Sequence, residues 1–292
     1  MSKVLSLDIG GTNLRAGLMD PASPGSPKTL GHWPAPASLE AFRGHVSGLI
    51  ETHKVSGIGI AVPGLAEGTR CIWIPNLPYL DGVDLADQFP GPEIALGNDA
   101  QMALLAEAAL GAARGQSDAI LLAIGTGIGS AVLSDGRILR GPSGSAASFG
   151  WAVADLDDLG DPVHGWLERM ASGRALDAIA SAAGLANGAD LIMQAREGNA
   201  EVRRLLEPPA AALGTTLAGA VALLGGNSII VSGGVAEALD MLAPLILEAL
   251  RRHLPPHLRG IEIIAGTFGP SASLVGAGLA ALGNPLWKET PS

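Results

Sequence analysis

The segment Asp8–Arg15, with the sequence DIGGTNLR, combines a carboxylate, two glycines and polar side chains at the end of an apolar run. Glycines in a turn between two strands let the backbone approach a ligand and present consecutive N–H groups. Thr12 and Asn13 add side-chain donors, and Asp8 could hold a water molecule on Mg²⁺. An ordinary hairpin turn is the alternative. Asp8 favours a binding site, because a carboxylate in an apolar strand is costly to bury without a partner.

A second glycine turn, Gly125-Thr126-Gly127-Ile128-Gly129, has the spacing of a dinucleotide fingerprint. That fingerprint requires the turn to lead into a helix, whereas residues 131–133 continue as a strand. Two glycine turns facing each other across a cleft could instead hold the two ends of one polyphosphate chain. A further pair, Gly233-Gly234, follows an apolar strand and could form a flat ledge for a purine. Such a pair is usually only a turn.

Asn98-Asp99 stands between an expected strand and an expected helix. Both residue types are favoured helix N-caps, and the helix dipole would keep Asp99 ionised. An ionised carboxylate at the carboxyl end of a strand is also what a general base for a hydroxyl group requires. The local sequence is compatible with both interpretations.

Strands and helices are expected to alternate along the chain, which is typical of α/β folds. Apolar runs indicate the strands, and runs of strong helix formers indicate the helices. The expected strands are 4–8, 16–18, 57–62, 93–96, 228–232 and 261–265, and the expected helices are 39–53, 101–113, 165–183, 188–195 and 200–224.

A weak internal repeat relates the two glycine turns. When residues 120–135 are shifted back by 115, Leu122 falls on Leu7 and Gly125 falls on Gly10. Each copy reads as a strand, a glycine turn and a strand at the start of an α/β segment. Chance similarity of two apolar hairpins is the alternative, but the equivalent placement favours two related domains.

The composition excludes several classes of protein. The chain has 292 residues, enough for two domains, and its net charge of −10 argues against a nucleic-acid or anionic-membrane surface. Cys71 is the single cysteine, so a reducing compartment is expected. The uncharged stretch after Pro208 is interrupted by Gly225-Gly226, which favours a buried helix, a turn and a strand over a membrane span.

The order and spacing of these motifs resemble the ROK family of sugar kinases over nearly the whole chain, with greatest similarity to bacterial glucokinases. The motifs that carry the resemblance are Asp8–Arg15, Ala61-Val62-Pro63-Gly64, Pro75-Asn76-Leu77, Gly97-Asn98-Asp99-Ala100, Ile124–Gly129, Ser232-Gly233-Gly234-Val235 and Gly269–Leu282. The resemblance implies two ribonuclease-H-like (actin/hexokinase-type) α/β domains around an interdomain cleft. We expect an N-terminal domain at 1–116 and a C-terminal domain at 117–292, whose last helix, about 271–283, packs back towards the first.

The resemblance also implies roles for individual residues. ATP phosphates would be held by Gly10, Gly11, Thr12, Gly125, Thr126 and Gly127. Gly233 and Gly234 would flank the adenosine, and Asp8 would help to organise Mg²⁺. Asn76, Asn98 and Asp99 would bind the sugar, and Asp99 would remove the proton from the attacking hydroxyl group.

The departures from the family pattern concern the sugar and zinc sites. Ser148 stands where the family has a sugar-binding glutamate, and Trp151 stands where it has a histidine. Leu159, Asp161 and Trp166 replace the family's zinc-binding cysteines. Glu168, the last residue of that motif, is retained, and we expect it to bind the substrate. We therefore expect no structural zinc, and a hydrophobic cluster of Trp151, Leu159 and Trp166 in its place. We also expect weak binding of plain glucose, or an acceptor with a larger or less polar group.

The sequence thus predicts a cytoplasmic ATP- and Mg²⁺-dependent kinase that phosphorylates a hydroxyl group of a sugar. The family resemblance implies a homodimer. One alternative is a sugar-responsive repressor, but the first phosphate-loop strand begins at Val4 and we expect no DNA-binding domain before it. The other is a sugar- or cyclitol-binding protein with little kinase activity. Asp8 and Asp99 argue against it, because a pure binder has no use for a base beside a triphosphate loop.

Overall fold

The structure is a computed structural model that describes residues 3–226 and 228–287. The chain divides into two compact units. Unit 1 comprises the residues up to 116, the segment 135–147 and the residues from 271 onward. Unit 2 comprises residues 117–134 and 148–270. The segment 135–147, which the sequence assigns to the C-terminal domain, therefore clusters with unit 1.

Unit 1 is built on a five-stranded sheet with the order β3-β2-β1-β4-β7. β2 is antiparallel to both β1 and β3, whereas β1, β4 and β7 run parallel. The carboxyl ends of the three parallel strands consequently meet at one edge of the sheet. The strands are β1 (Val4–Ile9), β2 (Asn13–Met19), β3 (Lys28–Pro34), β4 (Gly57–Val62) and β7 (Glu93–Asn98), and a small hairpin of β5 (Leu65–Glu67) and β6 (Arg70–Trp73) follows β4.

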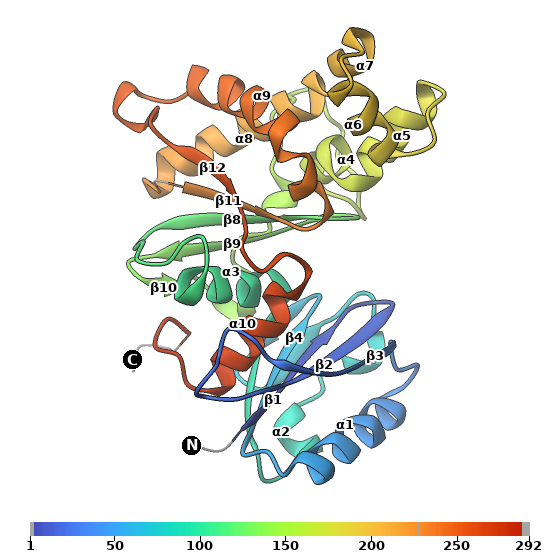
Figure 1. Ribbon diagram of the computed structural model, residues 1–292, viewed down its shortest axis with the longest axis vertical. Helices are drawn as coiled ribbons and strands as arrows, with labels where there is room; N and C mark the ends of the chain where they lie inside the picture. Colours follow the sequence, from blue (N-terminus) through green and yellow to red (C-terminus); the bar gives the residue numbers. More distant parts are fainter. Residues whose placement is uncertain (1–2, 227, 288–292) are drawn as a thin grey trace. The chain divides into compact units, whose positions relative to one another are not determined.

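Helix α10 (Ala272–Ala281) packs between the sheet and helix α3 (Asp99–Leu110) of unit 1 (Figure 1). Two glycines permit this close approach. A Cβ on Gly59 of β4 would lie 1.7 Å from the carbonyl oxygen of Ala277, and one on Gly276 would lie 1.7 Å from that of Met102. The remaining helices of unit 1 are α1 (Leu39–His53), α2 (Leu85–Gln88), η1 (Pro78–Leu80) and η2 (Pro142–Gly144).

The second five-stranded sheet has the order β10-β9-β8-β11-β12, which repeats the connectivity of the first sheet, and all of its strands except β10 belong to unit 2. An antiparallel hairpin, β8 and β9, is again followed by parallel strands. The register differs by one residue. Ile9 pairs with Leu14 across a four-residue turn, whereas Ile124 pairs with Ile128 across a three-residue turn. The shift of 115 residues therefore aligns β8 with β1, whereas β9 is offset by one residue from β2. The strands are β8 (Ala119–Ile124), β9 (Ile128–Ser134), β10 (Arg137–Ile138), β11 (Ser228–Ser232) and β12 (Glu262–Ala265).

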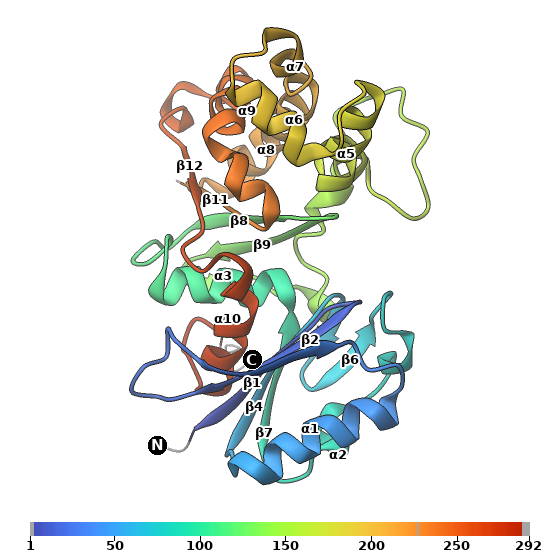
Figure 2. The same cartoon turned by 45° about the vertical axis from the view of Figure 1, so that its right-hand side comes forward.

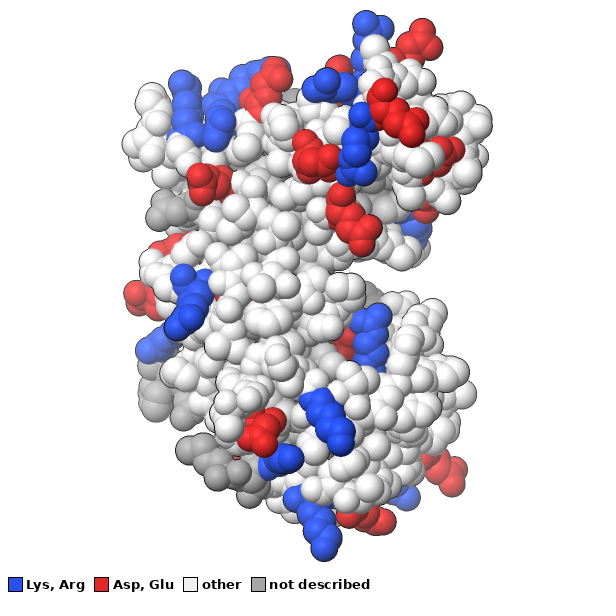
Figure 3. All heavy atoms as spheres, in the orientation of Figure 1, with Lys and Arg blue, Asp and Glu red and all other residues white. Residues whose placement is uncertain are grey.

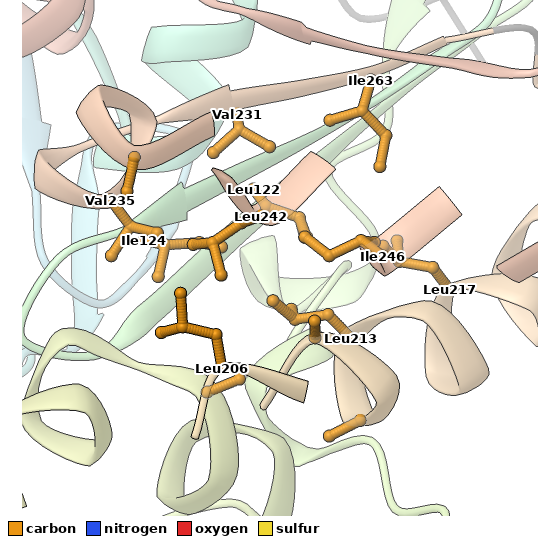
Figure 4. Close-up of a cluster of buried hydrophobic side chains, with 14 of the residues drawn as sticks. Leu122, Ile124, Leu206, Leu213, Leu217, Val231, Val235, Leu242, Ile246 and Ile263 are labelled. Atoms are coloured by element: carbon orange, nitrogen blue, oxygen red, sulfur yellow. The ribbon is translucent and has the colours of Figure 1, made fainter. Parts of the chain in front are cut away.

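Leucine, isoleucine and valine side chains from β8, β11 and β12 pack against α8 and α9 to form the core of unit 2 (Figure 4). The core includes Leu122, Leu213, Ile246 and Ile263. The helices are α4 (Trp166–Ala171), α5 (Gly173–Ala182), α6 (Gly188–Arg196), α7 (Ala200–Arg204), α8 (Glu207–Leu224) and α9 (Leu239–Arg252), with η3 (Phe149–Trp151), η4 (Gly234–Ala238) and η5 (Pro256–Leu258).

Two predicted helices are each divided in the structure. The helix predicted over 165–183 breaks at Ser172, whose hydroxyl accepts a hydrogen bond from the N–H of Ala175 at 3.3 Å and caps α5. The helix predicted over 200–224 breaks after α7, and α8 restarts with Pro208 in its first turn. Proline is tolerated there because the first N–H groups of a helix have no partner within it.

The surface carries few charges for its size, in line with a charged fraction of 16%. Figure 3 shows basic and acidic side chains interspersed on the face in view, with wide uncharged areas between them. None of the helices among the described residues has the length and apolar character needed to cross a bilayer.

Candidate functional site

The glycine turn of unit 1 is held by its own backbone. The N–H of Gly10 donates to the carbonyl of Asn13 at 2.8 Å, and Asn13 Nδ2 donates to Thr12 Oγ1 at 2.9 Å. Gly11 lies directly against Asn76, since a Cβ on Gly11 would be 2.8 Å from the Asn76 Cβ. The structure thus brings Asn76, one of the predicted sugar-binding residues, to the predicted phosphate turn.

Strand register brings Asp8 and Asp99 to the same edge of the sheet. Asp8 pairs with Ala61 of β4, which in turn pairs with Gly97 of β7. Asp99 comes two residues after Gly97, where β7 ends and α3 begins. Two carboxylates separated by ninety residues of chain are therefore neighbours.

The sequence left open whether Asn98-Asp99 serves as a helix N-cap or supplies a general base, and the structure assigns the cap to Asn98. Asn98 is the N-cap of α3, and its Oδ1 accepts hydrogen bonds from the N–H groups of Ala100 and Gln101 at 2.9 and 3.4 Å. Its Nδ2 donates to the carbonyl of Gly64 at 3.2 Å. Asp99 is the first residue of the helix, and its Oδ1 accepts from the N–H of Ala100 at 2.8 Å. Because Asn98 caps the helix, the Asp99 side chain is not needed as the cap.

The electrostatics of this pair favour proton transfer by Asp99. Burial and, to a smaller extent, the charge of Asp8 raise the pKa of Asp99 to about 6, against the lowering effect of the backbone N–H groups. Burial also raises the pKa of Asp8, although a hydrogen bond from Ser273 and the charge of Arg15 oppose this. Arg15 Nη1 lies 3.8 Å from Asp8 Oδ2. A carboxylate with a pKa near 6 is largely ionised at neutral pH and more basic than an ordinary aspartate.

The donor set of this edge is suited to Mg²⁺. Carboxylate oxygens are hard ligands, which Mg²⁺ prefers. The charge of Asp8, which adds to burial in raising the pKa of Asp99, also indicates an excess of negative charge that a divalent cation would relieve. Within residues 3–226 and 228–287, no three His, Cys, Asp or Glu side chains are arranged so that they could hold a metal ion by themselves. Any magnesium site here would therefore need oxygens from phosphates or water.

The glycine turn of unit 2 is held from outside as well as by its own backbone. The N–H of Gly125 donates to the carbonyl of Gly127 at 3.0 Å, and the N–H of Gly173 donates to the carbonyl of Gly125 at 2.7 Å. Glu168 Oε2 accepts a hydrogen bond from the N–H of Ile128 at 3.2 Å. A Cβ on Gly127 would lie 2.7 Å from the same oxygen, so a larger residue there would require the Glu168 carboxylate to move.

A cavity of about 300 Å³ in unit 2 opens beside this turn. Gly125 and Gly234 both line it, so two of the motifs singled out in the sequence meet at one cavity. Gly233 has a φ of +82°, and a Cβ on it would lie 2.5 Å from the carbonyl of Ile124. The other lining residues all come from α5, α6 and η4. They are Gly173, Leu176, Asp177, Gly188, Ala189, Ile192, Arg196, Val235, Glu237 and Ala238. The sequence did not indicate that α5 lines this cavity. The available signal was Ser172, a favoured N-cap residue, which marks the start of a helix at Gly173.

A second group that sequence reasoning missed surrounds Glu168. Arg174 Nη2 lies 2.5 Å from Glu168 Oε1, and His164 Nδ1 lies 3.3 Å from that same oxygen. The guanidinium of Arg174 also lies 3.1 Å from each ring nitrogen of His164. Glu168 is therefore bound to protein partners through both of its oxygens.

The expected hydrophobic cluster of Trp151, Leu159 and Trp166 does not form. Leu159 is fully exposed and Trp151 is 53% exposed, while Trp166 packs against the core of unit 2. Polar contacts hold the loop instead. Arg169 Nη2 donates to both carboxylate oxygens of Asp158 at 2.8 and 2.9 Å. Asp161 Oδ1 accepts from the N–H groups of Val163 and His164 at 2.7 and 2.8 Å.

Ser148 lies just before η3, at the start of this loop, which reaches away from the helices of unit 2 in Figure 2. The η3 turn is anchored to β9, because the N–H of Phe149 donates to Ser130 Oγ at 3.0 Å. Gly150 packs against the carbonyl of Ile128, which a Cβ would approach to 2.8 Å. Ser148 and Trp151 are thus held next to the glycine turn by backbone contacts.

Comparison with known proteins identifies the class of the fold and then the family. The structure of a ROK family glucokinase from Streptomyces griseus, solved with glucose and AMPPNP, matches 94% of this chain and 98% of its own, with 27% identity and a TM-score of 0.76. The fold is therefore the two-domain α/β fold of hexokinase-like sugar kinases. The ROK family matches residues 4–283, and the chain belongs to that family.

Two curated relatives are similar over nearly the whole chain. The N-acetylmannosamine kinase of Escherichia coli O7:K1 is 30% identical over 297 residues, which cover 97% of this chain and 99% of that protein. The bifunctional enzyme NanE/NanK of Brucella melitensis biotype 1 is 32% identical over 304 residues, covering 96% of this chain. The chain spans 54% of the length of the bifunctional enzyme.

Proposed function

We propose that this protein is an ATP-dependent kinase that phosphorylates a hydroxyl group of a sugar. The observation that carries the proposal is the placement of Asp99 at the carboxyl end of β7, beside Asp8, with a pKa raised to about 6. Membership of the ROK family and the named activities of the relatives support the same reaction class.

Asp99 acts as the general base in this proposal. The sugar hydroxyl gives its proton to the Asp99 carboxylate, and its oxygen forms a bond to the γ-phosphorus of ATP. The bond from that phosphorus to the bridging oxygen breaks, and the electron pair leaves with ADP. Asp99 afterwards releases the proton to water. General-base catalysis of this kind is worth about 10²- to 10⁴-fold in rate.

The two glycine turns provide the backbone donors for phosphates. Unit 1 contributes Gly10, Gly11, Thr12 and Asn13, and unit 2 contributes Gly125, Thr126 and Gly127. The cavity beside Gly125 and Gly234 takes the adenosine. Apolar side chains such as Leu176, Ile192 and Val235 would lie against the base. Asp8 would hold Mg²⁺ through water, and a bound Mg²⁺ would neutralise negative charge on the phosphates.

Asn76, Asn98, Asp99, Ser148 and Glu168 are the proposed acceptor-binding residues. A serine replaces the carboxylate with which the family binds the sugar, so one strong charge-assisted hydrogen bond is lost. Ser148 is smaller than the glutamate that it replaces, and Trp151 is less polar than the histidine that it replaces. We therefore propose an acceptor with an N-acyl or similar group, and the name of the N-acetylmannosamine kinase relative is in keeping with this.

The assay that tests the acceptor measures ATP consumption with glucose, mannose, N-acetylmannosamine, N-acetylglucosamine and a cyclitol. We expect the highest kcat/KM with an N-acylated amino sugar. A KM for glucose in the micromolar to sub-millimolar range of typical enzymes would contradict the acceptor proposal. Binding of sugars without any ATP consumption would favour the alternative of a sugar-binding protein.

The substitution Asp99→Asn tests the base. The variant should bind AMPPNP as the unmodified protein does and lose transfer by at least about 10²-fold. Asp87→Asn is the matched control, because Asp87 is an exposed aspartate in the first turn of α2. Retained turnover in Asp99→Asn would remove Asp99 from its proposed role.

The proposal includes a cytoplasmic location and a homodimer, as the family resemblance implies. Light scattering coupled to size-exclusion chromatography tests the second point. A mass near 29.4 kDa, that of one chain, would contradict it.

A further inference from the structure

The first turn of α5 contacts one end of the glycine turn of unit 2 directly and reaches the other end through Glu168. At one end, the N–H of Gly173 donates to the carbonyl of Gly125 at 2.7 Å. At the other end, Arg174 Nη2 lies 2.5 Å from Glu168 Oε1, and Glu168 Oε2 accepts from the N–H of Ile128 at 3.2 Å. Two adjacent residues of one helix thus fix the positions at which β8 enters the turn and β9 leaves it.

We propose that Arg174 is a positioning residue for the nucleotide, acting through Glu168 on the glycine turn at 125–128. This inference rests on the proposed function, in which that turn binds phosphates. Arg174 does not itself need to touch the nucleotide.

Two features of Glu168 explain why its partner matters. Its side chain is only 20% exposed, so its orientation depends on protein partners more than on water. It also lies against Gly127, whose N–H is one of the proposed phosphate donors. A carboxylate at that place would repel phosphates unless a cation balances its charge. Arg174 supplies the cation and fixes the carboxylate with a charge-assisted hydrogen bond.

The position of Arg174 is itself fixed. Its guanidinium lies 3.1 Å from both ring nitrogens of His164 and can donate a hydrogen bond to the one that carries no proton. Its backbone follows Gly173, where a Cβ would be 2.6 Å from the carbonyl of Gly125. The chain of contacts from α5 through Glu168 to the turn is therefore short and has little freedom. Such support determines how closely a binding site holds its productive geometry.

The test measures the Kd of AMPPNP by calorimetry in the absence of any acceptor. We expect Arg174→Met to raise the Kd about tenfold, and Arg174→Lys to recover part of that loss, because lysine keeps the charge but not the planar donor geometry. Arg252→Met is the matched control. Arg252 forms an exposed i,i+4 pair with Glu248 at 3.1 Å, and its replacement should leave the Kd unchanged.

A double-mutant cycle with Glu168→Gln separates positioning from a general loss of structure. In the Glu168→Gln background no charge remains to be balanced, so Arg174→Met should have little further effect on the Kd. Thermal unfolding of each variant shows whether it is folded. A folded Arg174→Met with a Kd within twofold of the unmodified protein would overturn the inference, as would additive effects in the cycle. Failure of the unmodified protein to bind AMPPNP would overturn the proposed function, and this inference with it.

Discussion

Asp8 and Asp99 lie at the ends of two strands separated by one strand of the same sheet, and the charge of Asp8 raises the pKa of Asp99. The pairing of Asp8 with Ala61 and of Ala61 with Gly97 sets their separation. The residue proposed to organise the metal thus also tunes the residue proposed to take the proton.

The rate of transfer should depend on pH through Asp99. Because the base must be ionised, kcat/KM, which reports the free enzyme, should fall as the pH drops below about 6, by roughly tenfold per unit. An NMR titration of the Asp99 carboxyl group in the unmodified protein and in Asp8→Asn checks the cause. Removal of the Asp8 charge should move the Asp99 titration to lower pH. A titration of Asp99 near the ordinary aspartate pKa of 3.8 in the unmodified protein would contradict the prediction.

Asp99→Asn should stabilise the protein at neutral and alkaline pH. The folded-state pKa of about 6 exceeds the ordinary value of 3.8, so folding favours the protonated form. That contribution to stability is fully present below pH 3.8 and is lost as the pH rises through 6. Asparagine keeps the hydrogen bond to Ala100 without the charge.

Urea unfolding of Asp99→Asn at pH 8 should therefore give a gain of about 1–3 kcal/mol, which shrinks towards pH 4. Asp87→Asn should show no such pH-dependent gain. Equal stability of Asp99→Asn and the unmodified protein across this range would contradict the assignment of a raised pKa.

The contact between β4 and α10 should not tolerate a methyl group. Gly59→Ala would place a Cβ 1.7 Å from the carbonyl of Ala277, so the helix must shift. We expect a loss of about 1–3 kcal/mol or more in the free energy of unfolding. Gly44→Ala is the control, because Gly44 is an exposed position of helix α1 and a Cβ there meets nothing within 4 Å. It should stabilise by about 0.5–1 kcal/mol. Similar effects of the two substitutions would contradict the packing argument.

Removal of metal should leave the loop between η3 and α4 intact. Asp158, Asp161 and Arg169 hold that loop through hydrogen bonds and need no ion. Treatment with a chelator should not change the melting temperature, and elemental analysis should find little zinc. Arg169→Met should accelerate proteolysis within the loop, whereas Arg252→Met should not. Stoichiometric zinc would contradict this prediction.

Local patterns in the sequence were sufficient for much of the fold. The β1–β2 and β8–β9 hairpins, the buried strand at 57–62 and the helix after Asn98 follow from apolar periodicity, turn glycines and a cap. The glycine turns are visible in the sequence because a backbone that must closely approach a ligand or another strand requires glycine. The one-residue difference in register between the two hairpins depends on the residue at which each strand ends, which apolar patterns locate only approximately.

Side-chain partners across long stretches of chain could not be read in the same way. Leu159 and Trp151 were expected in a cluster on grounds of hydrophobicity, yet they are exposed, because Arg169 and Asp158 give the loop a polar alternative. The roles of Arg174 and of Ser172, the cap of α5, also depend on partners that the local sequence does not identify. Nothing in the residues around position 174 points to a carboxylate on the preceding helix.

By itself, the sequence determined which residue types stand at the strand ends and turns, because those preferences are local. Only the tertiary structure decided that Asp8 lies beside Asp99, that Gly125 and Gly234 line one cavity, and that Glu168 holds the turn before Ile128. Each of these relationships depends on the register of parallel strands and the packing of helices. Those are set by the whole core rather than by any one segment.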